Sequence, residues 1–284
     1  MSNAILLIYC SDRKGLVAAV TRFIAEHAGN IVDLEQHVDE ERSVFFMRVA
    51  WSLEGFDLDR DEIRTRFEET VAKPYEMEWS LHFSDRPQRM AIFVSRLSHC
   101  LYDILARCRS GEWKVDVPLI VSNHTPLGKI ADQFGIDFHP IDVTRDNKVD
   151  AEARQLALLE NHEIDLVVLA RYMQILSPQF VEAYSNRIIN IHHSFLPAFP
   201  GARPYHSAFE RGVKVIGATS HYVTAELDGG PIIEQDVVRV THQDDVEDLV
   251  RKGRDLEKTV LSRAIYSHLQ RKVLVYDNRT VVFA

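Results

Sequence analysis

Hydrophobic residues recur along the chain at two different spacings, and the spacing divides the sequence into elements. The apolar run AILLIYC at 4–10 predicts a buried strand, whereas Leu16, Val20, Phe23 and Ile24 recur every three or four residues and predict an amphipathic helix. The first part of the chain is expected to form, in order, a strand, a helix, two strands, a helix and a strand at 4–10, 11–28, 31–41, 42–51, 57–72 and 75–83. This β-α-β-β-α-β order is typical of a ferredoxin-like unit.

A polar segment that contains a proline, DRPQR at 85–89, is the expected linker to a longer second unit. Beyond it, apolar runs alternate with amphipathic stretches, which predicts strands at 90–95, 115–123, 138–143, 164–170 and 187–191 and helices at 101–111, 126–135, 149–162 and 177–186. Such alternation predicts a doubly wound, Rossmann-like parallel sheet with helices on both faces. Two strands, a long helix and a hairpin are expected at 213–226, 231–240, 245–269 and 271–284. We therefore expect two α/β domains, at 1–84 and 90–284.

The composition excludes several classes of protein. The 284 residues are 46% hydrophobic and 26% charged, which is ordinary for a globular protein, and the net charge of −9 argues against nucleic-acid or anionic-membrane binding. No apolar run approaches the length of a transmembrane helix, and the first residues lack the features of a signal peptide. Cys10, Cys100 and Cys108 form no CxxC pair, so a reducing, cytoplasmic location is expected.

Polar side chains follow one of the predicted parallel strands directly, in NIHHSFLP at 190–197. Ligands of doubly wound sheets bind beyond the carboxyl ends of strands, which is where Asn190 and His192 are expected. Because they are two residues apart in an extended chain, they share one side, whereas His193 is expected to point away. Pro197 and Pro200 are expected to restrict the loop that follows. The alternative is that these side chains only satisfy loop backbone.

A second polar cluster lies in SHYVTAELDGGPI at 220–232. Asp228 has a simpler explanation in the tight turn LDGGP, and His221 could be a hydrogen-bonded core residue. Together with Asn190 and His192, however, a carboxylate can activate a water or an amine against a carbonyl and the amide and imidazole can hold the oxyanion. No metal is expected, because adjacent histidines point to opposite sides, and the motifs of dinucleotide, P-loop and nucleophile-elbow sites are missing.

The two clusters NIHHSFLPAFPG and GATSHYVTAELDGGPIIEQ resemble the folate-dependent formyltransferase family. The resemblance implies that Asn190, His192 and Asp228 are catalytic and that His221 supports them. The stretch LARYMQILSP resembles the family's pterin-pocket segment, which places Met173, Gln174 and Leu176 against the folate. The family implies a role in one-carbon metabolism and purine biosynthesis, with the folate as substrate and no cofactor.

Within this family, the chain resembles members that hydrolyse 10-formyltetrahydrofolate to tetrahydrofolate and formate. LPAFPGARPYHSAFERGVKVIGATSHYVT and GRDLEKTVLSRA carry that resemblance, and VSRLSHCLYDIL has no glycine where a phosphorylated acceptor would need a backbone cradle. Water is then the expected acceptor. The alternatives are formyl transfer to an amine, such as a glycinamide ribonucleotide or a sugar nucleotide, and a non-catalytic folate-binding or amino-acid sensor protein.

The N-terminal unit, with SDRKGLVAAV, resembles an ACT domain. This implies an amino-acid effector, glycine or methionine, at the loop formed by Asp12, Arg13, Lys14, Gly15 and Leu16, where a helix N-terminus can meet a carboxylate. Paired ACT domains imply a homo-oligomer, a dimer or a tetramer. The alternative is a helix start without a ligand, capped by Ser11 or Asp12.

Overall fold

The computed structural model describes residues 2–197 and 204–284 of the chain. Contacts divide the chain into an N-terminal unit (Met1–Pro87, Arg271–Tyr276 and Val281–Ala284) and a C-terminal unit (Gln88–Gln270 and Asp277–Thr280). Residues 271–284 were expected to belong to the second domain. Most of that segment groups with the N-terminal unit, because Leu274 and Phe283 pack against Leu7, Val44 and Phe46.

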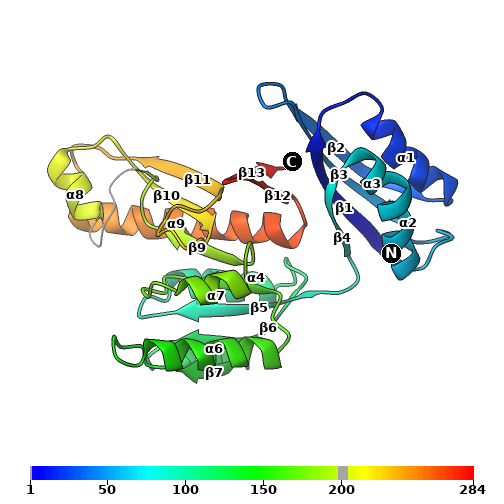
Figure 1. Ribbon diagram of the computed structural model, residues 1–284. Coiled ribbons are helices and arrows are strands. Elements are labelled where there is room, and N and C mark those ends of the chain that lie inside the picture. Colours follow the sequence, from blue (N-terminus) through cyan, green and yellow to red (C-terminus); the bar gives the residue numbers. More distant parts are fainter. Residues whose placement is uncertain (1, 198–203) are drawn as a thin grey trace. The chain divides into compact units, whose positions relative to one another are not determined.

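The N-terminal unit is a four-stranded antiparallel sheet with helices, drawn in blue and cyan in Figure 1. Its elements are β1 (Asn3–Ser11), α1 (Leu16–Glu26), β2 (Asn30–Asp39), β3 (Val44–Ser52), α2 (Arg60–Phe67), η1 (Glu68–Ala72), α3 (Lys73–Tyr75) and β4 (Glu78–Phe83). The sheet order β2-β3-β1-β4 confirms the predicted ferredoxin-like arrangement. The predicted cap by Ser11 or Asp12 is wrong, because Ser11 ends β1 and α1 follows Gly15 without a side-chain cap.

The C-terminal unit is the predicted doubly wound domain. Its elements are β5 (Gln88–Val94), α4 (His99–Arg109), β6 (Val115–Ser122), α5 (Gly128–Phe134), β7 (Asp137–Pro140), α6 (Lys148–Asn161), β8 (Leu166–Leu169), α7 (Pro178–Ala183), β9 (Ile188–His192), α8 (Pro204–Arg211), β10 (Val215–Tyr222), β11 (Ile232–Arg239) and α9 (Val246–Leu269). A hairpin of β12 (Val273–Tyr276) and β13 (Arg279–Val282) ends the chain, as predicted.

The seven-stranded sheet has the order β11-β10-β9-β8-β5-β6-β7. The strands from β9 to β7 are parallel, and β10 and β11 extend the sheet in antiparallel pairing. Consecutive strands β5, β6 and β7 proceed to one side, whereas β8 and β9 return to the other, so the strand order reverses beside β5. α9 packs along β9, β10 and β11 (Figure 1). The carboxyl ends of β8 and β9 therefore lie next to each other at the edge where such folds bind ligands.

The apolar runs of the sequence form the interior of this unit. Fully buried side chains of the central strands, such as Phe93 and Val167, pack with Phe180 of α7 and Leu159 of α6. This packing fixes the strand ends on which the polar clusters lie. No helix in the described part of the chain has both the length and the apolar character that crossing a membrane requires.

Candidate active site

β9 and β10 bring Asn190, His192 and His221 to one place. The strands pair with Asn190 opposite His221, and Asn190 Nδ2 lies 3.2 Å from His221 Nε2. His221 Nδ1 donates a hydrogen bond to the carbonyl of Tyr222 at 2.9 Å, so in the neutral ring Nε2 accepts from the Asn190 amide. The strand pairing thus fixes the position of His221, and the protonated ring would direct an Nε2–H toward Asp228.

Asp228 reaches this group from the turn that connects β10 to β11. Its backbone is in the left-handed region, with φ of 55°, and the turn lies so close to β10 that a Cβ at Gly230 would come within 1.8 Å of the Tyr222 carbonyl oxygen. Only glycine allows this approach. One carboxylate oxygen, Oδ2, lies 3.1 Å from His192 Nδ1, and the other lies 3.7 Å from His221 Nε2.

The two histidines set the charge of this carboxylate. The hydrogen bond from His192, and then the contact with the protonated form of His221, hold the pKa of Asp228 well below its usual range, although partial burial opposes them. Asp228 is therefore ionised at neutral pH. The other nitrogen of His192, Nε2, is buried and has no hydrogen-bond partner among the described residues. A polar atom of this kind is available to a bound molecule.

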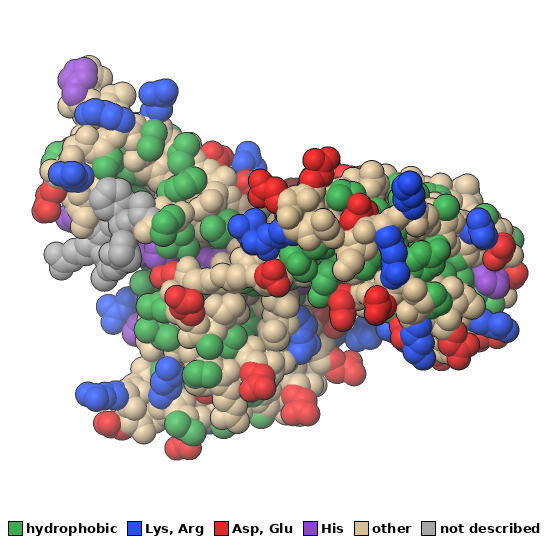
Figure 2. All heavy atoms as spheres, turned by 45° about the horizontal axis from the view of Figure 1, so that its top comes forward, with side chains coloured by type: hydrophobic (Ala, Val, Ile, Leu, Met, Phe, Trp, Pro, Cys, Tyr) green, Lys and Arg blue, Asp and Glu red, His purple; other side chains and the backbone are tan. Residues whose placement is uncertain are grey.

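These side chains line a cavity of about 330 Å³. The segment after β8 forms another part of its wall, with Met173, Gln174 and Leu176. Leu176 is buried, whereas Met173 is exposed, so this segment extends from the interior to the mouth. Figure 2 shows histidine side chains between hydrophobic ones on this unit. The structure thus gathers seven residues predicted for the active site and the folate around one cavity, namely Asn190, His192, His221, Asp228, Met173, Gln174 and Leu176.

His193 also lines this cavity, although it was expected to point away from the reacting centre. Its ring lies edge-on to that of His192, with the ring centroids 5.2 Å apart. β9 ends at His192, so His193 already belongs to the loop, where the alternation of a strand no longer sets the direction of its side chain. Burial, and then the positive charge of Arg171, lower the pKa of His193 to about 4, so it is neutral at physiological pH. Pro197 is described, whereas Pro200 lies outside the described residues.

Arg171 of the cavity wall contacts a buried carboxylate, Glu257, that was not predicted from the sequence. Glu257 of α9 is 1% exposed, and its carboxylate accepts hydrogen bonds from Tyr205 at 2.6 Å and His99 at 2.8 Å. Arg171, which lines the cavity, forms an ion pair with it, Nε to Oε2, at 3.5 Å. Glu257 could have been recognised in the sequence as a carboxylate on the apolar face of a predicted helix, one turn from Gly253 and Leu261.

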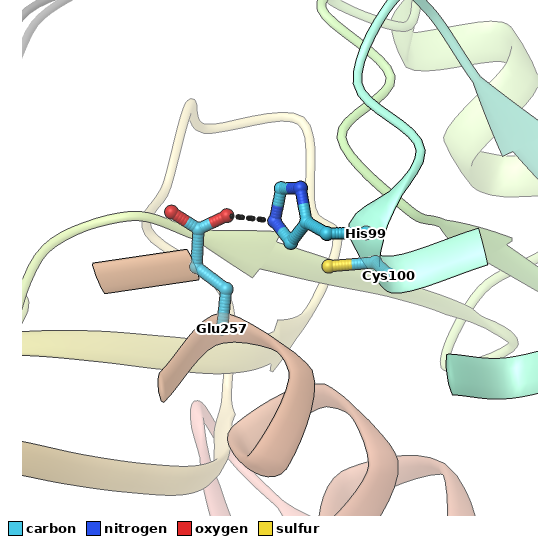
Figure 3. Close-up of side chains that lie close together, drawn as sticks. All are labelled: His99, Cys100 and Glu257. Atoms are coloured by element: carbon cyan, nitrogen blue, oxygen red, sulfur yellow. Dashed lines mark hydrogen bonds and ion pairs between the residues drawn. The ribbon is translucent and has the colours of Figure 1, made fainter. Parts of the chain in front are cut away.

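The same carboxylate belongs to a group that could be read as a metal site. Figure 3 shows His99 and Cys100 of α4 pointing toward Glu257 of α9, and one potential ligand atom of each lies within 4.8 Å of the others. Both Glu257 oxygens already accept hydrogen bonds, however, and the guanidinium of Arg171 adjoins them. Burial and then the charge of Glu257 raise the pKa of the Cys100 thiol, which favours its protonated form. The arrangement is that of a hydrogen-bonded ion pair.

The predicted effector loop lies at the start of α1 in the N-terminal unit. Gly15 has φ of 96°, and the guanidinium of Arg13 lies 5.1 Å from the centroid of the Tyr75 ring. Asp12, Arg13 and Lys14 are exposed, whereas the Leu16 side chain is buried in the core. A ligand at this loop could therefore meet Leu16 only through its backbone N–H.

The comparisons with known proteins agree with this division. Residues 88–265 match the formyl transferase family and residues 4–71 the ACT domain. The chain is 57% identical to a formyltetrahydrofolate deformylase of Synechocystis, over 99% of both chains. It is similar to the crystal structure of such an enzyme from Pseudomonas syringae, with a TM-score of 0.97, 47% identity and coverage of 100% and 95%. A glycinamide ribonucleotide transformylase of Symbiobacterium toebii has a TM-score of 0.66 and 34% identity and covers 72% of this chain and 98% of its own.

Proposed function

Because this chain belongs to the formyl transferase family and, within it, to the formyltetrahydrofolate deformylases, we infer that it hydrolyses 10-formyltetrahydrofolate to tetrahydrofolate and formate. The assignment of catalytic roles rests on the contact between Asp228 and His192, at 3.1 Å. Asn190 and His221 line the same cavity. The chain is 57% identical to a formyltetrahydrofolate deformylase and 34% identical to the transformylase, which favours hydrolysis over formyl transfer.

We propose the following roles for the side chains. The ionised Asp228 orients a water molecule and accepts its proton as the water oxygen bonds to the formyl carbon. In its protonated form, His192 donates from Nδ1 to Asp228 and from Nε2 to the developing oxyanion. The Asn190 amide is the second donor, and it must turn from His221 to act. His221 holds Asp228 and Asn190 in place.

The bond from the formyl carbon to N10 of the folate then breaks. N10 must gain a proton, and the carboxyl group of Asp228, which has just taken one from water, is its source. One proton is thus passed from water to the leaving nitrogen. The formic acid that forms loses its remaining proton to solvent, so formate and tetrahydrofolate are released. The chemistry requires no cofactor, since the folate is itself the substrate.

We further propose that the pterin ring packs against Met173, Gln174 and Leu176. In this part of the cavity wall Leu176 is a buried apolar side chain, Gln174 offers an amide for hydrogen bonds to the ring, and Met173 is exposed at the mouth. The cavity of about 330 Å³ suits the pterin and formyl groups, so the rest of the folate extends outward from it.

For the N-terminal unit we propose amino-acid regulation. Glycine or methionine would bind at Asp12, Arg13, Lys14, Gly15 and Leu16, with its carboxylate toward the first N–H groups of α1. A homo-oligomer, dimer or tetramer, would pair these units. The three cysteines of the chain are free, which suits an enzyme of the cytoplasm. Calorimetric titration with each amino acid tests the effector, and a matched Arg13→Gln variant should bind it more weakly. Absence of heat with both would contradict this role.

The direct test is incubation of the purified protein with 10-formyltetrahydrofolate in the absence of any amine. We expect formate and tetrahydrofolate in equal amounts. Formyl transfer would instead require an added amine such as glycinamide ribonucleotide, and a sensor protein would bind the folate without turnover.

A further inference from the structure

We propose that Arg171 binds the formate product inside the reaction cavity, and that Glu257 positions its guanidinium for this purpose. The inference rests on the proposed hydrolysis, because hydrolysis is the reaction that yields a carboxylate. Transfer of the formyl group to an amine would leave a neutral formamide, which needs no cation.

The charges around the cavity point to Arg171. Of the described residues that line it, Arg171 is the one with a permanent positive charge. His193 is neutral, as described above, and Asp228 is ionised. A formate anion released beside Asp228 would meet a like charge unless a cation offsets it. Arg171 and His193 line the same cavity as Asp228, and the charge of Arg171 lowers the pKa of His193.

The guanidinium of Arg171 has N–H donors that are available to a ligand. Its side chain is 10% exposed, and its ion pair with Glu257, at 3.5 Å, is longer than a hydrogen bond. Nε is buried without a hydrogen-bond partner among the described residues. A guanidinium has five N–H donors in a planar fork, which matches the two oxygens of a carboxylate.

Glu257 positions the guanidinium of Arg171 through their ion pair. Its two oxygens accept from Tyr205 and His99, so the carboxylate is fixed by partners other than Arg171. The hydrogen bond from His99 and the charge of Arg171 keep the pKa of Glu257 low despite burial, so it is ionised. The backbone of Arg171 adds to this positioning, because it is in the left-handed region, with φ of 64°, two residues after the end of β8.

A carboxylate at Arg171 could also come from the glutamate tail of the folate. The position of Arg171 favours formate. Exposed side chains of the cavity, Met173, Ile175 and Leu227, mark its open side, where a long and hydrated tail would leave. Arg171, His193 and Glu257 are nearly buried, on a side that suits a small anion.

Inhibition and binding by sodium formate test the inference. In the wild type, with tetrahydrofolate present, formate should bind and inhibit. Arg171→Gln should weaken this by about 10-fold to 100-fold, the loss expected for a hydrogen bond between charged groups. Arg171→Lys should weaken it less, because it keeps the charge. Arg187→Gln, an exposed arginine that does not line the cavity, is the matched control and should leave it unchanged.

Glu257→Gln tests the positioning role. It should weaken formate binding by less than Arg171→Gln and change KM for the folate little, a split that general damage to the fold would not produce. Since Arg171→Gln removes the permanent positive charge beside the buried Glu257 carboxylate, the double variant Arg171→Gln/Glu257→Gln guards against misfolding. If the double variant folds and binds formate as the wild type does, the inference is wrong.

Two further outcomes separate the possibilities. If Arg171→Gln raises KM for 10-formyltetrahydrofolate but not for 10-formyltetrahydropteroate, which lacks the glutamate, and formate inhibition is unchanged, then Arg171 binds the tail and the inference is overturned. If the wild type releases no formate from either substrate, the proposed function itself fails. Binding of free formate is measured without turnover, so the two failures are distinguishable.

Discussion

Replacing Asp228 by asparagine removes the proposed base while keeping nearly the same shape. The carboxylate contacts His192 at 3.1 Å and His221 at 3.7 Å, and an amide cannot accept the proton of water. General-base catalysis typically contributes about 10²–10⁴ in rate, which is about 3–5 kcal/mol of barrier. We expect kcat to fall by at least that factor, because the variant also loses the charge that orients His192. KM and the dissociation constant for the folate should change little, since the proposed pterin wall is distant in sequence and unaltered.

The assay is formate release from 10-formyltetrahydrofolate, with folate binding measured separately by calorimetry and thermal unfolding as a check of the fold. Asp236→Asn is the matched control, because Asp236 lies on β11 outside the cavity and pairs with Arg263. Its rate should equal that of the wild type. The low pKa of Asp228 adds a pH test: the carboxylate stays ionised until the pH falls well below 3.8, so any loss of rate between pH 7 and 5 must arise elsewhere. A folded Asp228→Asn variant that retains a tenth or more of the rate would refute the reasoning.

Three other predictions follow from the same geometry. Asn190→Ala and His192→Ala should each lower kcat by about 10²–10³ and raise KM less, as for lost oxyanion donors; a rise in KM alone, measured in steady-state kinetics, would assign them to substrate binding. His193 has a pKa of about 4 in the folded protein against 6.5 when unfolded, so its contribution to the free energy of unfolding is complete above pH 6.5 and declines by about 3 kcal/mol as the pH falls to 4. Denaturant unfolding of His193→Asn should show a shallower decline of stability with falling pH, and an unchanged dependence on pH would contradict the burial argument. Gly253→Ala should lower both stability and activity although alanine favours helices, because the new Cβ would lie 2.2 Å from Tyr205, whose hydroxyl donates to Glu257. A variant as stable as the wild type in thermal unfolding would show that Tyr205 moves freely.

The fold followed from hydrophobic spacing because both units are built of regular elements. Buried runs such as 164–170 and the helical pattern of 245–269 left little ambiguity, and their order selected the two architectures. The start of α1 was misplaced because Ser11 continues β1 and a left-handed Gly15, not a polar side chain, precedes the helix. Local patterns also did not show that the end of the chain packs with the N-terminal unit, since that depends on contacts of Leu274 and Phe283 across most of the sequence.

The candidate site was predictable where its residues lie in recognisable motifs at strand ends. Asn190, His192, His221 and Asp228 meet at one cavity because β9 pairs with β10. Arg171 and Glu257 could not be paired from the sequence, because 86 positions separate them and only the packing of α9 beside β9 brings them together. The orientation of His193 depended on where β9 ends, which a strand pattern does not define to the residue.

The central claim is that water is the acceptor of the formyl group at the Asp228 cavity. Turnover of 10-formyltetrahydrofolate in water enriched in ¹⁸O, without any amine, tests it most directly. Mass spectrometry of the product should show one labelled oxygen in each formate released by the wild type, and no formate from Asp228→Asn above the uncatalysed rate. Formate that appears only after an amine is added, or labelled formate released equally well by the Asp228→Asn variant, would contradict the account.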